Sequence, residues 1–199
     1  MGKVVKFPLR TPEKFGNRRI RKKRKVDLED FGQLNLFEAG KVVALSAEQS
    51  YFEQALSRDE NNDPGAEQLY LKAIDKGESV EDAYCNLGVL KSAQKDSTTA
   101  IDFLTRCLQL NPRHFEAHYN LGNVYSDIGN LPLAKVHYEL ATQILPEAPN
   151  AYYNLGLVLI SLKAYAEAID CLDKYINLNP ANGTETARQL ITTLTAIAQ

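Results

Sequence analysis

The sequence predicts an all-α protein built from stacked helical hairpins, and three observations support this fold class. The tripeptide Asn-Leu-Gly recurs every 34 residues, at 86–88, 120–122 and 154–156. The blocks of 34 residues that contain these tripeptides align without a gap. Apolar residues recur in each block at helical spacing. A fixed period of this length is typical of solenoids, in which each unit packs on its neighbours.

The composition is that of a soluble globular protein of one or two domains. Of the 199 residues, 44% are apolar and 24% are charged, and no apolar run is long enough to span a membrane. Lys and Pro interrupt the apolar residues near the start, which argues against a signal peptide. Three cysteines, Cys85, Cys107 and Cys171, form no disulfide framework or zinc knuckle. We therefore expect a cytoplasmic protein with reduced, packed thiols.

The charges divide the chain into two unlike parts. Residues 1–26 hold 11 of the 23 Lys and Arg residues and one acid, Glu13, whereas residues 27–199 hold 12 basic and 24 acidic residues. We predict a basic, largely disordered arm and linker over residues 1–45. The arm contributes solubility, binds a polyanion such as nucleic acid or ribosomal RNA, or docks on the acidic body of its own or another copy. The candidate polyanion-binding residues are Arg18, Arg19, Arg21, Lys22, Lys23, Arg24 and Lys25.

A short amphipathic peptide, residues 33–37, interrupts this polar linker. Its distinctive residues are Gln33, Leu34, Leu36 and Phe37. One interpretation is that the apolar side chains cover the exposed end of the first hairpin, because terminal repeats of a solenoid need capping. The other is that the peptide resembles the motif by which bacterial replication and repair proteins bind the sliding clamp.

Helical signals begin at Ser46, and the helical domain is predicted to cover residues 46–199. Residues 46–80 form a degenerate opening repeat, with a capping box of Ser46 and Gln49 on its first helix. Asp63 and Pro64 are the expected N-cap and first residue of its second helix. Three full repeats follow, at 81–114, 115–148 and 149–182. A helix over 184–198, capped by Thr184, has one apolar face and closes the stack.

The full repeats share residue types at five positions, two of which belong to the recurring tripeptide. They hold an aromatic or His residue at position 4, Leu-Gly at 7 and 8, Ala at 20 and Pro at 32; the residues are Tyr84, His118 and Tyr152; Leu87-Gly88, Leu121-Gly122 and Leu155-Gly156; Ala100, Ala134 and Ala168; and Pro112, Pro146 and Pro180. Gly and Ala allow the two helices of a hairpin to cross closely, and Pro ends the second helix. With these residues the chain resembles the tetratricopeptide repeat family, which implies a right-handed α-solenoid.

The resemblance also implies that the first helix of each repeat lines a concave groove. The residues expected there are Asn86, Val89, Tyr119, Asn120, Asn123, Tyr153, Asn154 and Leu157. Asn86, Asn120 and Asn154 would form a ladder of amides that holds the backbone of an extended peptide, or each would bond to the neighbouring repeat. No Lys or Arg occupies an inner position, which disfavours the carboxylate clamp that holds chaperone C-termini. A neutral or basic peptide, including the chain's own arm, suits this groove.

No catalytic motif accompanies these features. His114 and His118 are four residues apart, but the repeat register places the first in a loop and the second in an aromatic core position. We expect no catalysis, cofactor or metal. The leading hypothesis is a non-enzymatic adaptor that binds a partner peptide or helix in the groove. The alternatives are a factor associated with nucleic acid or the ribosome through the arm, and an accessory protein that binds the sliding clamp through residues 33–37. The sequence leaves the oligomeric state open.

Overall fold

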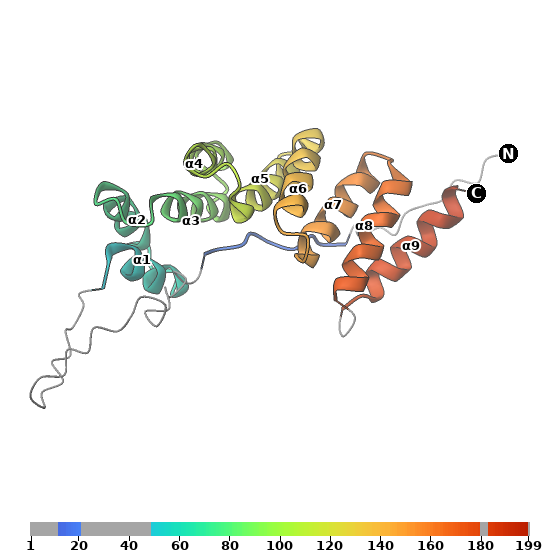
Figure 1. Ribbon diagram of the computed structural model, residues 1–199, viewed down its shortest axis with the longest axis horizontal. Helices are drawn as coiled ribbons and strands as arrows, with labels where there is room; N and C mark the ends of the chain where they lie inside the picture. Colours follow the sequence, from blue (N-terminus) through green and yellow to red (C-terminus); the bar gives the residue numbers. More distant parts are fainter. Residues whose placement is uncertain (1–11, 21–48, 180–182, 199) are drawn as a thin grey trace, which may run out of the picture.

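The computed structural model describes residues 12–20, 49–179 and 183–198, and over these ranges the ordered secondary structure is entirely α-helical (Figure 1). The helices are α1 (Tyr51–Glu60), α2 (Ala66–Asp75), α3 (Val80–Ala93), α4 (Ser97–Leu110), α5 (Phe115–Asp127), α6 (Leu131–Ile144), α7 (Pro149–Ser161), α8 (Tyr165–Leu178) and α9 (Glu185–Ala198). They form an elongated stack, so the predicted all-α solenoid is confirmed.

The stack consists of four hairpins and a closing helix. Helices α1 and α2, α3 and α4, α5 and α6, and α7 and α8 pack in pairs, and each pair contacts the next. The second helices of the last three pairs begin at Ser97, Leu131 and Tyr165, which are 34 residues apart. Three buried apolar clusters follow one another along the stack. Neighbouring repeats therefore share a core, as expected for a solenoid.

The opening hairpin begins later than the sequence signals indicate. Helix α1 is capped by Ser50, whose Oγ accepts from the Glu53 N–H at 3.2 Å while the Ser50 N–H donates to the Glu53 carboxylate. Ser46, the predicted cap, lies outside the described residues. Both serines have Gln or Glu three residues later, so the pattern alone does not distinguish them. Asp63 and Pro64 also precede α2 instead of opening it: Asp63 Oδ1 accepts from the Gly65 N–H at 2.7 Å, within the turn before the helix.

The two helices of each full repeat cross where glycine faces a large side chain. A Cβ atom on Gly88 would lie 2.5 Å from Leu104, and one on Gly122 would lie 2.6 Å from Tyr138. On Gly156 the distance to Leu172 would be 3.1 Å. Ala100, Ala134 and Ala168 are fully buried on the opposing helices. The predicted reason for Gly at these positions, close approach of two helices, agrees with these distances.

The end of the stack is covered as predicted. Helix α9 buries Ala187, Leu190 and Leu194 in the last apolar cluster, while Thr192 and Thr195 are exposed on its other face. Helices α4 and α6 end two residues before Pro112 and Pro146, which is consistent with the helix-terminating role of proline. Within the described ranges, no helix combines the length and apolar character needed to cross a membrane.

The tightest crossings give a test of the packing. Gly122→Leu is expected to lower the free energy of unfolding by about 1–3 kcal/mol, because Tyr138 is fully buried and has little space to move. Gly156→Ala is the graded comparison and should cost less, since its Cβ meets the more adaptable Leu172 at 3.1 Å. Urea denaturation measures both variants. An unchanged midpoint for Gly122→Leu would contradict the helix crossing described above.

Candidate peptide-binding groove

Residues 12–20 of the basic arm run in extended form along the inner face of the stack (Figure 1). We call residues 12–20 the arm segment. Phe15 lies at α7, Arg18 at α5 and Ile20 at α3, so the segment runs opposite to the order of the repeats. This part of the arm, which the sequence predicts to be largely disordered, thus contacts three successive repeats.

Three asparagines hold the backbone of the arm segment, and each binds one residue twice. Asn154 Oδ1 accepts from the Phe15 N–H at 2.8 Å, and its Nδ2 donates to the Phe15 carbonyl at 2.9 Å. Asn120 binds the Arg18 N–H and carbonyl at 2.7 and 2.8 Å. Asn86 binds the Ile20 N–H and carbonyl at 2.9 and 3.2 Å. We call these three side chains the asparagine ladder. An amide has one acceptor and two donor hydrogens, which suits it to this double pairing.

The ladder is also held from behind by the repeats. Asn154 Nδ2 lies 3.1 Å from the Tyr119 hydroxyl, and Asn86 Nδ2 lies 3.2 Å from that of Tyr70. Asn120 Nδ2 contacts Cys85 Sγ at 3.7 Å. Each asparagine therefore bonds to the neighbouring repeat and to the arm segment at once, so the two roles considered from the sequence occur together. These contacts fix the amide orientation before a backbone is bound.

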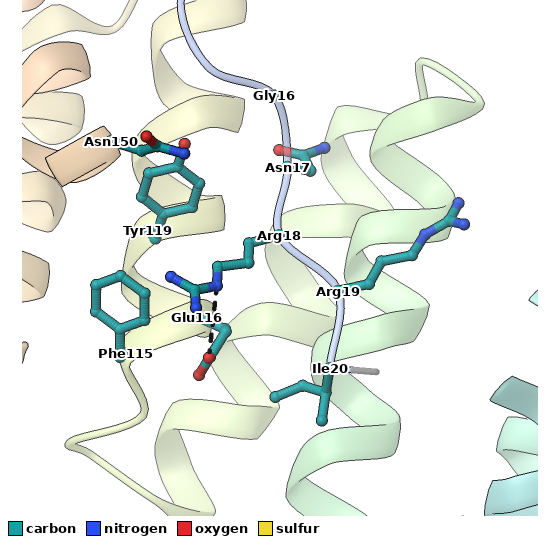
Figure 2. Close-up of a pocket in the computed structure, with 9 residues that line it drawn as sticks. All are labelled: Gly16, Asn17, Arg18, Arg19, Ile20, Phe115, Glu116, Tyr119 and Asn150. Carbon is teal, nitrogen blue, oxygen red and sulfur yellow. Dashed lines mark ion pairs between the residues drawn. The ribbon is translucent and has the colours of Figure 1, made fainter. Parts of the chain in front are cut away.

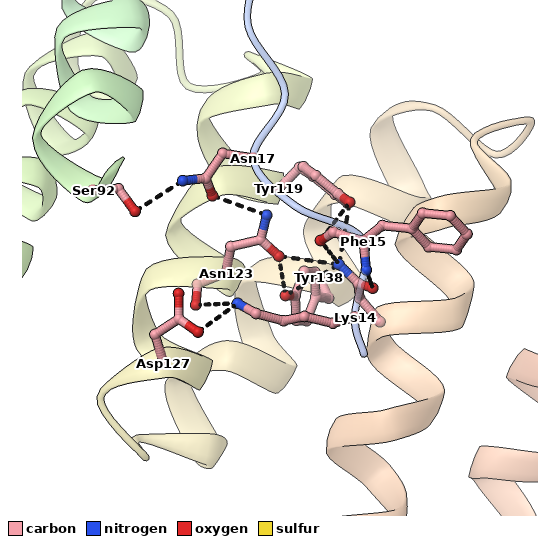
Figure 3. Close-up of polar contacts among 9 residues, drawn as sticks. Lys14, Phe15, Asn17, Ser92, Tyr119, Asn123, Asp127 and Tyr138 are labelled. Carbon is pink, nitrogen blue, oxygen red and sulfur yellow. Dashed lines mark hydrogen bonds and ion pairs between the residues drawn. The ribbon is translucent and has the colours of Figure 1, made fainter. Parts of the chain in front are cut away.

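Phe15 and Lys14 anchor one end of the arm segment. The Phe15 ring packs edge-on against Tyr153 with centroids 5.1 Å apart, and lies 5.9 Å from Tyr175. The Lys14 ammonium donates to the Asn123 carbonyl at 2.7 Å and pairs with Asp127 at 3.1 Å (Figure 3). Burial lowers the pKa of Lys14, and Asp127 opposes this shift. The groove thus accepts an aromatic ring and a cation side by side.

Two arginines anchor the other end of the arm segment. The Arg18 guanidinium lies 5.2 Å from the centre of the Phe115 ring and 4.0 Å from Glu116 (Figure 2). Arg19 pairs with the Asp59 carboxylate at 3.2 Å and donates to the Asp59 carbonyl at 3.3 Å. Burial raises the pKa of Asp59, while Arg19 and a hydrogen bond from Tyr70 oppose the shift. Arg18 and Arg19 are therefore turned toward acidic groups of the stack.

Open space remains beside the arm segment. A cleft of about 490 Å³ lies between residues 16–20 and a wall formed by Phe115, Glu116, Tyr119 and Asn150 (Figure 2). A second, of about 650 Å³, lies near Lys14 and includes Asp127 and Leu157. The groove is therefore wider than the chain that now occupies it.

Most of the predicted groove residues contact the arm segment, and several residues that were not predicted also contact it. Asn86, Tyr119, Asn120, Asn123, Tyr153 and Asn154 contact it, Leu157 lines the second cleft, and Val89 is buried among the helices. Sequence reasoning did not assign Asp59, Ser92 or Tyr175 to the groove. Asp59 belongs to the degenerate repeat and Tyr175 to a second helix, where the repeat pattern gives no groove assignment. The burial of Asp59, which makes it a partner for the basic arm, is visible only in the structure.

Two sequence predictions fall outside the described residues. Of the candidate polyanion-binding residues, only Arg18 and Arg19 are described, and residues 21–25 are not. The clamp-type peptide of Gln33, Leu34, Leu36 and Phe37 also lies outside the described ranges. Both roles stay predictions.

Behind Asn120 lies a cluster of thiols and imidazole that the sequence did not bring together. The donor atoms of Cys85, Cys107 and His114 lie within 4.8 Å of one another, and all three residues are buried. Cys and His are ligands that zinc prefers. Here, however, His114 Nδ1 accepts from the Ala117 N–H at 3.2 Å and Nε2 lies 3.1 Å from Asp82, so the ring already has two partners.

Contacts within this cluster shift the pKa values of His114 and Cys107. Burial alone would lower the pKa of His114, whereas hydrogen bonds to Asp82 and Cys107 raise it; the bond that Nδ1 accepts from the Ala117 N–H nevertheless requires the neutral ring, with its proton on Nε2 toward Asp82. Hydrogen bonds from Cys85 and His114 lower the pKa of the Cys107 thiol to about 6. Because Asn120 contacts Cys85, this hydrogen-bonded cluster supports the middle rung of the asparagine ladder.

A pair of histidines lies elsewhere in the stack. His118 Nε2 lies 3.1 Å from the Pro112 carbonyl and therefore carries the proton, which leaves Nδ1 to accept from His137 Nδ1 at 3.1 Å. Burial and the neighbouring His118 lower the pKa of His137 to about 4, and burial also lowers the pKa of His118. Protonating both rings would set two N–H groups against each other. His118 fills the predicted aromatic position of its repeat, and His114 caps α5 from the preceding loop.

The fold and the groove define a helical-repeat scaffold whose inner face holds an extended chain. Family models described as "Tetratricopeptide repeat" match residues 81–114, 103–135 and 149–182. Together with the helical hairpins and the shared positions of each repeat, these matches show that the chain belongs to the tetratricopeptide repeat family. Proteins of this family act as protein-interaction scaffolds.

Similar proteins contain these repeats within larger or comparable chains. Protein O-mannosyl-transferase Tmtc3 of Drosophila melanogaster is 29% identical over 63% of this chain. A UDP-N-acetylglucosamine–peptide N-acetylglucosaminyltransferase of Giardia intestinalis is 30% identical over 48% of it. The aligned parts make up only 14% and 6% of those proteins. The crystal structure of MamA protein has a TM-score of 0.66 and 25% identity, covering 74% of this chain and 80% of its own.

The asparagine ladder predicts a pattern of amide protection. In the full chain, Asn120→Ala should lower the hydrogen-exchange protection of the Arg18 amide by about tenfold, the effect of losing roughly one hydrogen bond. The Phe15 amide should retain more protection, because Asn154 still binds it. Exchange followed by NMR at single residues checks both. Equal protection of Arg18 with and without Asn120 would contradict the pairing.

The histidine pair predicts a loss of stability in mild acid. The folded-state pKa of His137 lies below the unfolded value of about 6.5, so the unfolded chain takes up protons first as the pH falls. The contribution of His137 to the free energy of unfolding should therefore be fully present above about pH 6.5 and be lost as the pH falls toward about 4. His137→Gln, which keeps a polar partner for His118, should reduce this decrease. Urea denaturation at about pH 7 and about pH 5 compares the two chains; equal decreases would contradict the assignment.

Proposed function

We propose that this interaction scaffold captures an extended peptide segment of a partner protein in the groove along α3, α5 and α7. The observation that carries this proposal is the asparagine ladder, in which each of three amides binds both the N–H and the carbonyl of one residue. Recognition of this kind acts on the backbone, so it requires an extended chain and no particular side chain.

The energetics assign separate roles to backbone and side chains. Six backbone hydrogen bonds at about 0.5–1.5 kcal/mol each contribute about 3–9 kcal/mol. Ordering an extended segment and losing its free motion cost at least as much. The ladder therefore aligns the peptide, and side-chain contacts such as that of Phe15 with Tyr153 supply the net affinity.

The proposed role is binding without catalysis in the cytoplasm. The groove presents amides, tyrosine rings and carboxylates that hold the arm segment. Cys85, Cys107 and Cys171 are free thiols, which is consistent with a reducing compartment. The transferase names of two relatives concern proteins of which the aligned repeats are a small part.

A direct titration tests the ladder. The probe is a fluorescent synthetic peptide with the sequence of residues 12–20, added to a chain that lacks residues 1–20. We expect saturable binding that Asn120→Ala with Asn154→Ala weakens by about thirtyfold or more, because four of the six backbone bonds are lost. Fluorescence anisotropy gives the dissociation constants, and circular dichroism verifies that the helices are intact.

The matched control is Asn61→Ala, which removes an exposed amide whose Nδ2 donates to the nearby Ser57 carbonyl in the α1–α2 turn. It should leave peptide binding unchanged. Binding that persists in the double variant, or that Asn61→Ala weakens equally, would overturn capture by the ladder.

A further inference from the structure

We infer that the groove selects basic partner segments of the form Phe-x-x-Arg-Arg-Ile, and that the arm segment is an intramolecular competitor which such a partner must displace. The inference rests on the proposed function and adds to it the chemistry of the partner and the means of its control. The asparagine ladder contacts only the backbone of its occupant and therefore cannot select a sequence. The inference follows instead from the side-chain contacts of the arm segment.

The buried carboxylate of Asp59 requires a cation in whatever occupies the groove. Its side chain is only 5% exposed, and besides Arg19 its close polar contact within the described ranges is the Tyr70 hydroxyl at 3.2 Å. Removing one partner of a buried ion pair leaves the other charge without compensation, which is strongly unfavourable. An occupant without a basic residue at this position therefore binds much more weakly. Arg suits the position best, since Arg19 reaches both the carboxylate and the carbonyl of Asp59.

The aromatic position is set by Tyr153 and Tyr175 at the other end. These rings lie 4.9 Å apart, and both pack against Phe15. Edge-to-face packing of this kind adds to the burial of apolar surface, so a small side chain here loses both contributions. Arg18 and Lys14 are weaker determinants, because the Arg18 side chain is 51% exposed and Asp127, the partner of Lys14, is 50% exposed.

The spacing of these determinants fixes the register of the occupant. The ladder binds the backbone at positions 15, 18 and 20, so the aromatic residue must precede the first Arg by three residues. The groove does not select the side chain at position 16, because a Cβ atom on Gly16 would have no neighbour within 4 Å. Ile20 completes the pattern by packing at the margin of two apolar clusters.

Covalent attachment makes the arm segment a strong competitor. Residues 21–48 join it to the first hairpin, and a covalent connection that can span two sites gives an effective concentration on the order of 1 mM. A segment that binds as a free peptide with a dissociation constant of about 10–100 µM then weakens an identical external peptide by about tenfold to a hundredfold. The groove is thus closed to weak ligands and open to tighter ones of the same chemistry.

The stack retains its core when the arm segment is removed. The buried members of all three apolar clusters come from residues 49–198, and only Phe15 and Ile20 of the arm segment lie at their margins. A chain that lacks residues 1–20 is therefore suited to testing the competition. A full-length chain with Phe15→Ala and Arg19→Ala gives a second test without truncation.

The experiment measures anisotropy of the peptide of residues 12–20 with each chain. We expect the truncated chain and the full-length double variant to bind the peptide at least tenfold more tightly than the unaltered full chain. Peptides with Phe15→Ala or Arg19→Glu should bind the truncated chain at least tenfold more weakly than the unaltered peptide. The matched control, a peptide with Gly16→Ala, should bind like the original.

The outcomes separate this inference from the proposed function. Equal peptide affinity of the full and truncated chains would overturn competition and leave capture by the ladder standing. Equal affinity for the Phe15→Ala, Arg19→Glu and unaltered peptides would overturn the selectivity alone. Failure of the truncated chain to bind any peptide, with its helices intact, would overturn both proposals. Sedimentation of the full chain should show a monomer; a dimer that requires residues 12–20 would place the segment in a second copy and overturn intramolecular competition.

Discussion

The close crossing of paired helices at Gly88, Gly122 and Gly156 is the constraint on which the groove depends. Each ladder asparagine lies two residues before one of these glycines, about 200° around the same helix. When glycine faces the second helix of its hairpin, the asparagine must face the other way, toward the inner surface. The 34-residue period repeats this arrangement, so packing of the hairpins and alignment of the asparagine ladder have a common cause.

The arm and the stack have opposite charges, and the groove is where the opposite charges meet. Lys14, Arg18 and Arg19 pair with Asp127, Glu116 and Asp59; the first two acids lie on α5 and the third on α1, so they come from two different hairpins. The three pairs are unequal, since only Asp59 is almost fully withdrawn from water. Coulombic attraction among the exposed groups favours encounter, whereas the pair of Arg19 and Asp59 favours one register.

Much of the fold and the centre of the groove could be predicted from the sequence, because both follow from a periodic pattern. Asn86, Asn120 and Asn154 occupy equivalent places in equivalent helices, and the structure places all three against the arm segment. Asp59 and Tyr175 were missed because they lie outside the inner positions of full repeats. Ser46 and Ser50 carry the same kind of capping pattern, and only tertiary structure selects Ser50. The docked arm segment has no period at all, since its backbone, not a recurring side chain, makes the ladder contacts.

The length of groove that the arm segment crosses has a consequence for how the stack unfolds. Helices of a solenoid contact mainly their neighbours, so disorder at one end spreads only weakly to the other. The arm segment instead touches the first hairpin through Asp59 and the last through Tyr153 and Tyr175. It acts as a cross-brace between distant units of a nearly one-dimensional array. Opening of a terminal hairpin therefore releases contacts at the opposite end, and the braced stack melts as one cooperative unit where an unbraced one would fray.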